Sequence, residues 1–374
     1  MVMSLKKICF LLADLRNVGP TRQTLNIIKY SGAKDSCVVL TLFEEPTESL
    51  VGLYYENNIK VECLHLSRKT FVVNAVNRIA KFCEKEKIEI IHSYGVKPDV
   101  VAYLTAKKKG IKHIITLRNF PVEDLSGRMN PWIGKFIAHI HLYVLKRCKY
   151  LIACSETIAR KMRNSYGVDI RAIQNGVDTE LFQAQGNVLR KDLLKQYQIE
   201  GIKKIFICTN SFIPRKHNGE IAEAFVGAKL QNALLLFLGN GPLLDELKKK
   251  YKVFSNILFI GKQKDVSAYL RSADVFVSAS DSEGLPNAVI ESLACGCPVV
   301  LSDISQHREI LDEVPDCGRL FPLHDVDSLS LIMQKCLLDQ INFSDVALSV
   351  NKSPFTMKRM GLSYKLYYEG VFDA

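Results

Sequence analysis

Short apolar runs alternate with longer helical patterns along the whole chain. Each run is four to seven residues long, and the segments between the runs have apolar residues at helical spacing. Apolar runs of this length, separated by helices, are typical of parallel strands that are buried on both faces. In the first half the runs are Lys7–Ala13, Cys37–Phe43, Ile88–His92, His113–Thr116 and Tyr150–Cys154. In the second half they are Lys204–Thr209, Ala233–Leu238, Asn256–Ile260, Val275–Ser278 and Pro298–Ser302.

The 374 residues suit two domains of ordinary size rather than one core. Each half alone predicts an open, doubly wound α/β sheet of the Rossmann-like kind. Asn175-Gly176-Val177-Asp178 is a turn signal, and strand patterning restarts at Lys203. We therefore predict domains over 1–178 and 179–352, with a terminal helix in 353–374 that docks back toward the first domain. If the two domains face each other, their cleft is the expected active site, because such sheets bind ligands at the carboxyl ends of their strands.

Charge is distributed unevenly between these halves. The chain has a net charge of +11; residues 1–178 carry 28 Lys+Arg against 16 Asp+Glu (+12), and residues 179–374 carry 22 against 23 (−1). A basic half indicates an anionic partner, such as a membrane surface or a lipid-linked diphosphate, or simply a solvated face that keeps the chain soluble. Nucleic acid is disfavoured as a partner, because zinc-ligand spacing, an aromatic RNA-binding signature and a clear recognition helix are missing.

The eleven cysteines are scattered, and several lie in apolar runs, where a free thiol behaves as a small hydrophobe. They predict a reducing, cytoplasmic compartment without a disulfide framework. Cys295 and Cys297 are too close together to suggest a metal site. No apolar run reaches the ~18 residues that a membrane span needs. Met1–Asp14 is interpreted as a first core strand rather than a cleaved signal peptide.

The segment Asp281–Val300, which follows a predicted strand, carries the candidate chemistry. Gly284 lets the backbone approach a ligand closely, and Pro286 suits the first turn of a helix that stops at Gly296. Free amides at about Asn287–Val289 would then lie at the carboxyl end of a strand. Such a helix N-terminus binds phosphate through its amides and its dipole.

Two carboxylates flank this predicted phosphate site. Glu283 lies in the loop before the helix, and Glu291 lies one turn further in. Acids are poor ligands for phosphate, but they accept hydrogen bonds from hydroxyls of the two groups that a diphosphate joins, a ribose and a sugar. Either glutamate alone is more simply a capping acid or a solvated helical acid. Together with Gly284, Pro286 and Gly296, the pair indicates a nucleotide-sugar site.

This segment resembles the E-x-x-x-x-x-x-x-E signature of the retaining glycosyltransferases of family 4, which have the two-domain GT-B fold. The resemblance extends over nearly the whole chain and points to the type that builds bacterial surface polysaccharides. Further marks of the family appear in the expected order, and their combination is more specific than any one of them. They are Asn17–Thr24 with its glycine loop, Ile91–Gly95, Cys154–Glu156, Asn175–Asp178 and Gly239–Pro242.

The resemblance implies a role for each matched position. Glu291 would bind the donor ribose, and Glu283 would bind the donor sugar beside the reacting centre. Lys216 matches the lysine that neutralises the leaving diphosphate. Further contacts to the donor are expected from Gly284, Leu285, Pro286, Asn287, Gly19, Gly239 and Asn240.

The sequence departs from the family pattern at two positions. Ser211 stands where the family usually has an arginine; Arg215, next to Lys216, is the candidate substitute, with a solvated charge as the alternative. Arg118, in the segment Thr116–Asp124, stands where many members have a histidine near the donor sugar. A fixed cation there could bind the sugar or an anionic acceptor, but it cannot act as a general base. The opposite interpretation is that the site has lost activity.

The resemblance also implies transfer with retention of anomeric configuration and without a metal or other cofactor. Charge builds on the phosphate as the glycosidic bond breaks, and Lys216, Arg215 and the helix N-terminus would stabilise it. The leaving phosphate could itself take the proton of the acceptor. A UDP-linked sugar is the favoured donor, although the residues leave the nucleotide and the sugar open.

Pro131–Arg147 has large apolar residues interleaved with cations, which fits either a core-facing helix or an amphipathic helix at a membrane surface. With the basic first half, it suggests a cytoplasmic enzyme, peripheral on the inner face of the cytoplasmic membrane. The expected acceptor is a saccharide or lipid-linked saccharide. The alternatives are a non-catalytic sugar-nucleotide binder, a sugar-nucleotide epimerase, or a phosphorylase, although the sequence lacks the pyridoxal-phosphate lysine context of a phosphorylase.

Overall fold

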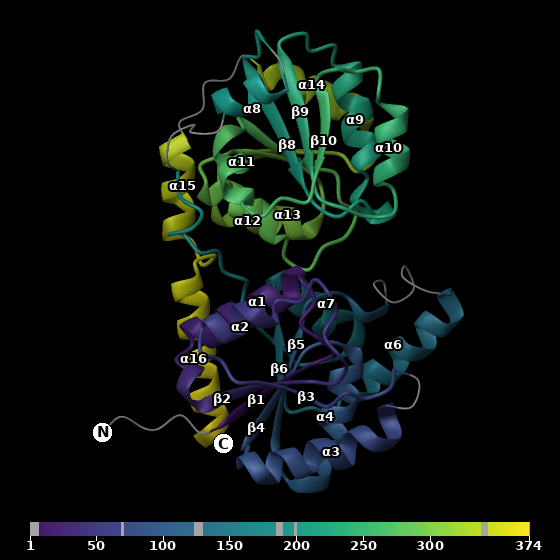
Figure 1. The fold of residues 1–374 in the computed structure, drawn as a ribbon, viewed down its shortest axis with the longest axis vertical. Helices are drawn as coiled ribbons and strands as arrows, with labels where there is room; N and C mark the ends of the chain where they lie inside the picture. The colour runs from purple at the N-terminus through teal and green to yellow at the C-terminus, as the bar shows by residue number, and fades with distance from the viewer. Residues whose placement is uncertain are drawn as a thin grey trace. The chain divides into compact units, whose positions relative to one another are not determined.

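A computed structural model describes residues 7–68, 71–122, 130–184, 190–197, 200–337 and 343–373. Residues 1–6 of the predicted first strand and Glu123 and Asp124 of the Arg118 segment lie outside these ranges. The chain forms two compact units (Figure 1). The first unit comprises Met1–Asn175 with Met357–Ala374, and the second comprises Gly176–Thr356.

The first unit is built on a parallel sheet of seven strands in the order β3-β2-β1-β4-β5-β6-β7. Its strands are β1 Ile8–Leu12, β2 Cys37–Thr41, β3 Val61–Cys63, β4 Ile90–Ser93, β5 Lys112–Leu117, β6 Tyr150–Ala153 and β7 Arg171–Ala172. Its helices are α1 Gly19–Tyr30, η1 Lys34–Ser36, α2 Val51–Glu56, α3 Phe71–Glu86, α4 Val96–Lys109, α6 Pro131–Leu145, α7 Glu156–Tyr166 and α16 Met357–Asp373.

Strand β1 shows why its whole run is apolar. Ile8, Phe10 and Leu12 pack into a core with α1 and α16, whereas Cys9 and Leu11 pack into a second core with α3 and α4. Successive side chains of a strand point to opposite faces, so a sheet with helices on both faces buries every residue of its central strands. The apolar runs therefore mark strands that lie between two helical layers.

The terminal helix α16 lies beside α1 in the first unit (Figure 1). Its Met360, Tyr364 and Tyr368 belong to the same core as β1 and α1. Gly361 makes the close approach possible, because a Cβ there would lie 2.3 Å from the carbonyl oxygen of Tyr30. The apolar face of this segment is thus part of the first unit's core, although the helix follows the whole second unit in sequence.

The second unit has a parallel sheet of six strands in the order β10-β9-β8-β11-β12-β13. Its strands are β8 Lys204–Thr209, β9 Ala233–Leu238, β10 Ile257–Gly261, β11 Val275–Ser278, β12 Val299–Ser302 and β13 Gly318–Phe321. Its helices are α8 Arg190–Gln196, η2 Pro214–Lys216, α9 Asn218–Gly227, α10 Leu244–Lys250, α11 Val266–Ser272, α12 Asn287–Ala294, α13 Ser305–Glu313, α14 Val326–Cys336 and α15 Phe343–Lys352.

In both sheets the strand order reverses at the first strand of the unit. Strand β1 lies between β2 and β4, and β8 lies between β9 and β11. Ligands of doubly wound sheets bind outside the carboxyl ends of the strands at this reversal. The predicted class, two Rossmann-like α/β units, is confirmed. Within the described ranges, no helix combines the length and the apolar character that crossing a membrane requires.

Candidate active site

The loops that follow β8 and β11 meet at the carboxyl edge of the second sheet. These strands are neighbours, and the amide of Asp281 in one loop donates a hydrogen bond to the carbonyl oxygen of Arg215 in the other at 3.1 Å. Phe212, which is fully buried, anchors the β8 loop by packing against Phe237 and Phe259. The two loops therefore form one platform for charged side chains.

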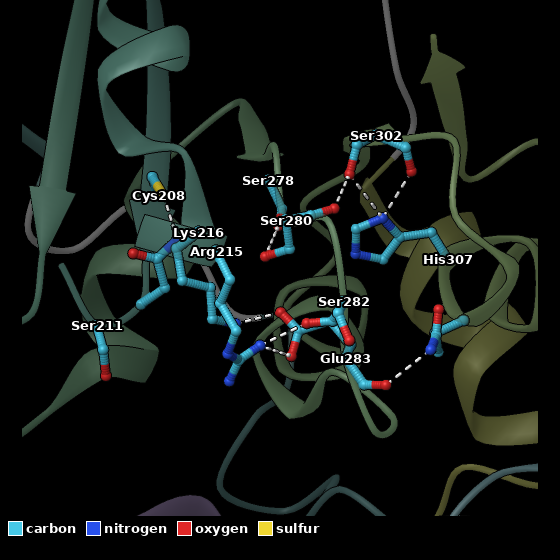
Figure 2. A network of polar contacts seen from close by, with 12 residues as sticks. Cys208, Ser211, Arg215, Lys216, Ser278, Ser280, Ser282, Glu283, Ser302 and His307 are labelled. Carbon is cyan, nitrogen blue, oxygen red and sulfur yellow. Dashed lines mark hydrogen bonds and ion pairs between the residues drawn. The ribbon is translucent and has the colours of Figure 1, made fainter. Parts of the chain in front are cut away.

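Glu283 is the centre of an ion cluster on this platform, which we call the Glu283 cluster: Glu283, Lys216 and Arg215. Lys216 Nζ pairs with Glu283 Oε1, and an Arg215 guanidinium nitrogen lies 3.4 Å from Glu283 Oε2. Arg215 also donates to the carbonyl oxygen of Ser282. Figure 2 shows both cationic side chains directed at the same carboxylate. The structure thus brings together three of the four residues predicted to be catalytic.

The Glu283 carboxylate is held ionised although it is only 8% exposed. Burial alone raises its pKa, but the charges of Lys216 and Arg215, with hydrogen bonds from Lys216 and Ser280, lower the pKa to about 2. At neutral pH Glu283 is therefore an acceptor of hydrogen bonds and not a proton donor. Two cations against one carboxylate leave a net charge of +1 in the cluster, which suits an anionic ligand.

Arg215, and not the residue at position 211, places a second cation beside Glu283. Ser211 is exposed and lies apart from the ion pairs, whereas Arg215 and Lys216 converge on Glu283 (Figure 2). The two cations are consecutive, but the tight turn of η2 lets both side chains reach opposite oxygens of one carboxylate. Arg215 is consequently the residue that supplies a second cation in this chain.

A layer of buried polar side chains behind Glu283 was not predicted from the sequence. The side-chain amide of Gln306 donates a hydrogen bond to the carbonyl oxygen of Glu283 at 2.8 Å. The hydroxyl of Ser302 donates to the carbonyl oxygen of Ser280 at 2.5 Å. His307 Nδ1 lies 2.7 Å from the carbonyl oxygen of Ser302, and burial lowers the pKa of His307 to about 4, so its ring is neutral at pH 7. The available signal was the polar sequence Ser302–His307 directly after β12.

The predicted phosphate-binding helix is α12. It begins at Asn287, one residue later than predicted, because Pro286 has extended backbone; no side chain caps it. The amide of Val289 donates to the carbonyl oxygen of Pro286 at 3.1 Å, so this predicted free amide is engaged. Gly284, Leu285 and Pro286 are buried in the loop before the helix, and Glu291 lies one turn into it, partly exposed. The N-terminus of α12 thus lies four residues after Glu283 and one turn before Glu291.

Gly239 and Asn240 follow β9 and brace the β8 loop. The amide of Phe212 donates to the carbonyl oxygen of Asn240 at 3.1 Å. Gly239 has φ 137°, and a Cβ there would lie 1.8 Å from the carbonyl oxygen of Asn210, so no other residue fits. The turn at Gly239 and Asn240 therefore supports the loop that carries Lys216.

The remaining predicted residues, Gly19 and Arg118, belong to the first unit. Gly19 is the first residue of α1, after β1. Arg118 follows β5; it donates to Asn175 Oδ1 at 2.8 Å, and its guanidinium lies over the Tyr94 ring at 5.3 Å. Its Nε and second terminal nitrogen are buried without a hydrogen-bond partner in the described part of the chain. His92 is neutral at pH 7, because its burial, and to a smaller extent the positive charge of Arg118, hold its pKa well below the ordinary value.

Two family models match the chain, one to each unit. The model described as Glycosyltransferase Family 4 matches residues 19–181, and the model described as Glycosyl transferases group 1 matches residues 190–348. Together they span most of both sheets, including the Glu283 cluster and α12.

Similar proteins agree with these matches. The chain is 26% identical over 264 residues to an Escherichia coli protein named UDP-Gal:alpha-D-GlcNAc-diphosphoundecaprenol alpha-1,3-galactosyltransferase, and the match spans 66% of each protein. It is 23% identical to the O-antigen biosynthesis glycosyltransferase WclY of Escherichia coli, over 98% of this chain and 99% of WclY. The crystal structure of HepE from Anabaena in complex with UDP matches with a TM-score of 0.83 at 16% identity, over 97% of this chain and 100% of HepE. The chain belongs to the family 4 type of glycosyltransferases and has their GT-B fold.

Proposed function

We propose that this glycosyltransferase moves a sugar from a nucleotide-diphosphate sugar, with UDP favoured, to a saccharide or lipid-linked saccharide in the synthesis of a cell-surface polysaccharide. We further propose retention of configuration and no metal at the reacting centre. The observation that carries the proposal is the Glu283 carboxylate, held ionised by Lys216 and Arg215 just before the N-terminus of α12. The names of the Escherichia coli relative and of the UDP complex of HepE support a UDP-linked donor.

The charges of the Glu283 cluster indicate what the cluster and the Glu283 carboxylate would each contribute to the reaction. The net charge of +1 in the Glu283 cluster, with the N-terminus of α12, would stabilise the leaving diphosphate as the glycosidic bond breaks. A carboxylate with a pKa near 2 is too weak a base to take the acceptor proton at neutral pH. Its role is to accept hydrogen bonds from donor hydroxyls, and the leaving phosphate takes the proton, which favours attack from the same face and hence retention.

Arg118 supports the acceptor half of the reaction. Two of its buried nitrogens have no partner in the described ranges, and a buried guanidinium is normally satisfied by oxygen acceptors. We assign these donors to an anionic or hydroxyl-rich part of the substrate. The alternative of a site without activity would leave a buried charge with no ligand to bind.

The exposed face of α6 supports peripheral contact with an anionic membrane on the cytoplasmic side. Trp132, Ile133, Phe136, Ile140 and Tyr143 lie on one exposed stripe of the helix, with Trp132 81% and Phe136 67% exposed. Lys135 lies 5.8 Å from the Trp132 ring, and Arg147 lies 3.7 Å from the Tyr143 ring. Apolar rings flanked by cations suit the boundary between lipid headgroups and acyl chains. The opposite face of α6, with Ala138, Leu142 and Leu145, packs into the unit, and the exposed face is the one that we propose for the membrane.

A screen of nucleotide sugars by thermal shift tests the donor assignment. We expect a UDP-sugar to raise the melting temperature and Glu291→Ala to abolish that rise. Nuclear magnetic resonance of the product formed with an acceptor panel would then give its anomeric configuration. Donor binding without transfer to any acceptor would instead support a non-catalytic binder, and an inverted product would contradict retention.

Sedimentation with vesicles tests the membrane contact separately. The wild type should bind vesicles that contain 30 mol% anionic lipid at low salt, and Trp132→Ser/Phe136→Ser should weaken this binding. Val253→Ser, which removes an exposed apolar side chain from the second unit, is the matched control. Equal binding by all three proteins would reject this face as the contact.

A further inference from the structure

Two histidines and a glutamate gather beside the loop that carries Lys216. His217 follows η2 directly, Glu220 lies in the first turn of α9, and His324 lies between β13 and α14. Their ligand atoms all lie within 4.8 Å of one another. In the ranges that the structure describes, this is the one group of at least three His, Cys, Asp or Glu side chains spaced in this way.

One oxygen atom of Glu220 is shared by the two imidazoles. Glu220 Oε1 lies 3.0 Å from His217 Nδ1 and 3.0 Å from His324 Nδ1, and the two rings are inclined at 71° with centroids 4.6 Å apart. Two ligands of a tetrahedral zinc ion, each bound at about 2.0–2.1 Å, lie about 3.3 Å from each other. Two of the three distances between ligand atoms are thus already close to that value, and the third is no more than 4.8 Å.

His217 faces a second carboxylate with its other ring nitrogen. His217 Nε2 lies 3.2 Å from Asp281 Oδ2. A neutral imidazole carries only one N–H, so it can donate to Glu220 or to Asp281 but not to both. The lone pair of the other nitrogen then faces a carboxylate, and a cation in front of that nitrogen would bind both groups. A metal-bound histidine commonly donates its remaining N–H to a carboxylate, which is the arrangement that a cation at Nδ1 would produce here.

We propose that His217, Glu220 and His324 bind one Zn²⁺ ion through Nδ1, Oε1 and Nδ1, with water completing the coordination. Two imidazoles and a carboxylate are a ligand set that zinc favours, whereas Mg²⁺ and Ca²⁺ favour oxygen ligands. No step of the proposed transfer uses this ion. Its role is to join α9 to the β13–α14 loop and, through His217 and Asp281, to hold the Lys216 loop against the Glu283 loop.

Zinc binding is measured on the full chain without a polyhistidine tag, after dialysis against EDTA. Titration with Zn²⁺ in competition with a chromophoric chelator should give one ion per chain. His324→Asn should weaken the affinity at least tenfold, and Glu220→Gln should do the same. His324 has left-handed backbone with φ 64°, which asparagine tolerates, so the variant removes a ligand without straining the loop.

His65→Asn is the matched control. His65 also has left-handed backbone, with φ 46°, and lies 3.5 Å from Glu44, but it has no third ligand in the described ranges. Its variant should bind zinc as tightly as the wild type. No zinc binding by the wild type, or equal weakening by His65→Asn, would overturn the proposal.

The zinc measurement is independent of the proposed transfer. A chain that binds a UDP-sugar but not Zn²⁺ would refute the zinc site alone, and the reverse result would refute the donor assignment alone. As a second readout, Zn²⁺ should raise the melting temperature of the wild type and not that of His324→Asn.

Discussion

Each unit has a charged side chain with buried polar atoms in a loop that follows a strand of its sheet, but the two charges have different partners. In the second unit, Glu283 meets two cations, and its carbonyl oxygen accepts from Gln306. In the first unit, Arg118 meets an amide oxygen and a tyrosine ring but no carboxylate. A buried charge is costly unless it is paired or hydrogen-bonded. The Glu283 cluster is therefore satisfied by the protein itself, whereas two donor nitrogens of Arg118 have no partner in the described ranges, and we propose a ligand for them.

This difference predicts different responses to mutation. Loss of a partner in the Glu283 cluster should reduce both catalysis and stability, because the cluster is part of the fold as well as of the site. Loss of Arg118 should reduce catalysis with a smaller loss of stability, because only one of its nitrogens donates to another side chain in the described ranges. Measurements of transfer rate and of unfolding free energy on the same variants separate the two cases.

The largest effect is expected for Lys216→Ala. It removes the closer of the two cations from Glu283 and a charge that would stabilise the leaving diphosphate, so kcat should fall about 10²–10³-fold. The unfolding free energy should fall by about 3 kcal/mol, because a buried carboxylate loses its main partner. Donor-dependent UDP release and urea denaturation measure the two quantities. Lys248→Ala, at an exposed position on α10, should change neither, and full activity in Lys216→Ala would contradict the assignment.

The second prediction concerns the pH dependence of the Glu283 cluster. The pKa of Glu283 is about 2 in the folded chain, below its ordinary value of 4.5. The ionised form therefore stabilises the fold above pH 4.5, and this contribution is lost as the pH falls from 4.5 toward 2. Integrated over that window it amounts to about 3 kcal/mol.

Urea denaturation of the wild type and of Glu283→Gln between pH 2 and pH 6 tests this dependence. The difference in unfolding free energy between the wild type and Glu283→Gln should be constant above pH 5. It should become smaller as the pH falls from 4.5 toward 2, because the wild type then loses the contribution of the ionised carboxylate. Glu246→Gln, an exposed glutamate on α10, should give a curve parallel to the wild type. Parallel curves for Glu283→Gln would show that the pKa of Glu283 is not lowered.

The third prediction concerns Arg118. Arg118→Met keeps the length of the side chain and removes the charge and its donors. Loss of one hydrogen bond from a charged group costs about 1.5–2 kcal/mol, so kcat/KM for the acceptor should fall about 10–30-fold. The unfolding free energy should fall by about 1.5–2 kcal/mol, because the hydrogen bond to Asn175 is lost, while two of the removed nitrogens have no partner in the described ranges.

Steady-state kinetics with the acceptor varied, and donor affinity measured without acceptor, separate the possible roles of Arg118. Unchanged donor affinity places Arg118 on the acceptor, and weakened donor affinity would place it on the donor sugar. Arg160→Met, exposed on α7, is the control. A stability loss as large as that of Lys216→Ala would remove the distinction between the two units.

The fold was predictable from the sequence wherever a strand is buried on both faces. Runs such as Ala233–Leu238 coincide with strands because all their residues are apolar. Strands β3, β7 and β13 were missed. They have only two to four residues, and most of these are partly exposed, so they leave no apolar run.

Some residues of the candidate site could likewise be predicted from the sequence, and others could not. Glu283 and the start of α12 could be predicted because a turn and a helix signal lie beside the acid in sequence, and Lys216 was implied by its match to the lysine of the family. Gln306 and His324 could not, since folding brings them to the site from the ends of other strands. The direction of Arg215 also depends on the turn of η2, which adjacent residue types do not specify.

The smallest effect is expected for Arg215→Ala. Arg215 is 31% exposed and lies 3.4 Å from Glu283, whereas Lys216 is 14% exposed and closer. An ion pair with this exposure contributes about 0.5–1 kcal/mol, so kcat should fall only about two- to fivefold. If Arg215 replaces the arginine that the family has at position 211, Ser211→Arg added to Arg215→Ala should recover most of this rate. Donor-dependent UDP release compares the single and double variants. A rate that stays low in the double variant would mean that Arg215 acts from its own position, by holding the carbonyl of Ser282 and thus the Glu283 loop, and not as an interchangeable charge.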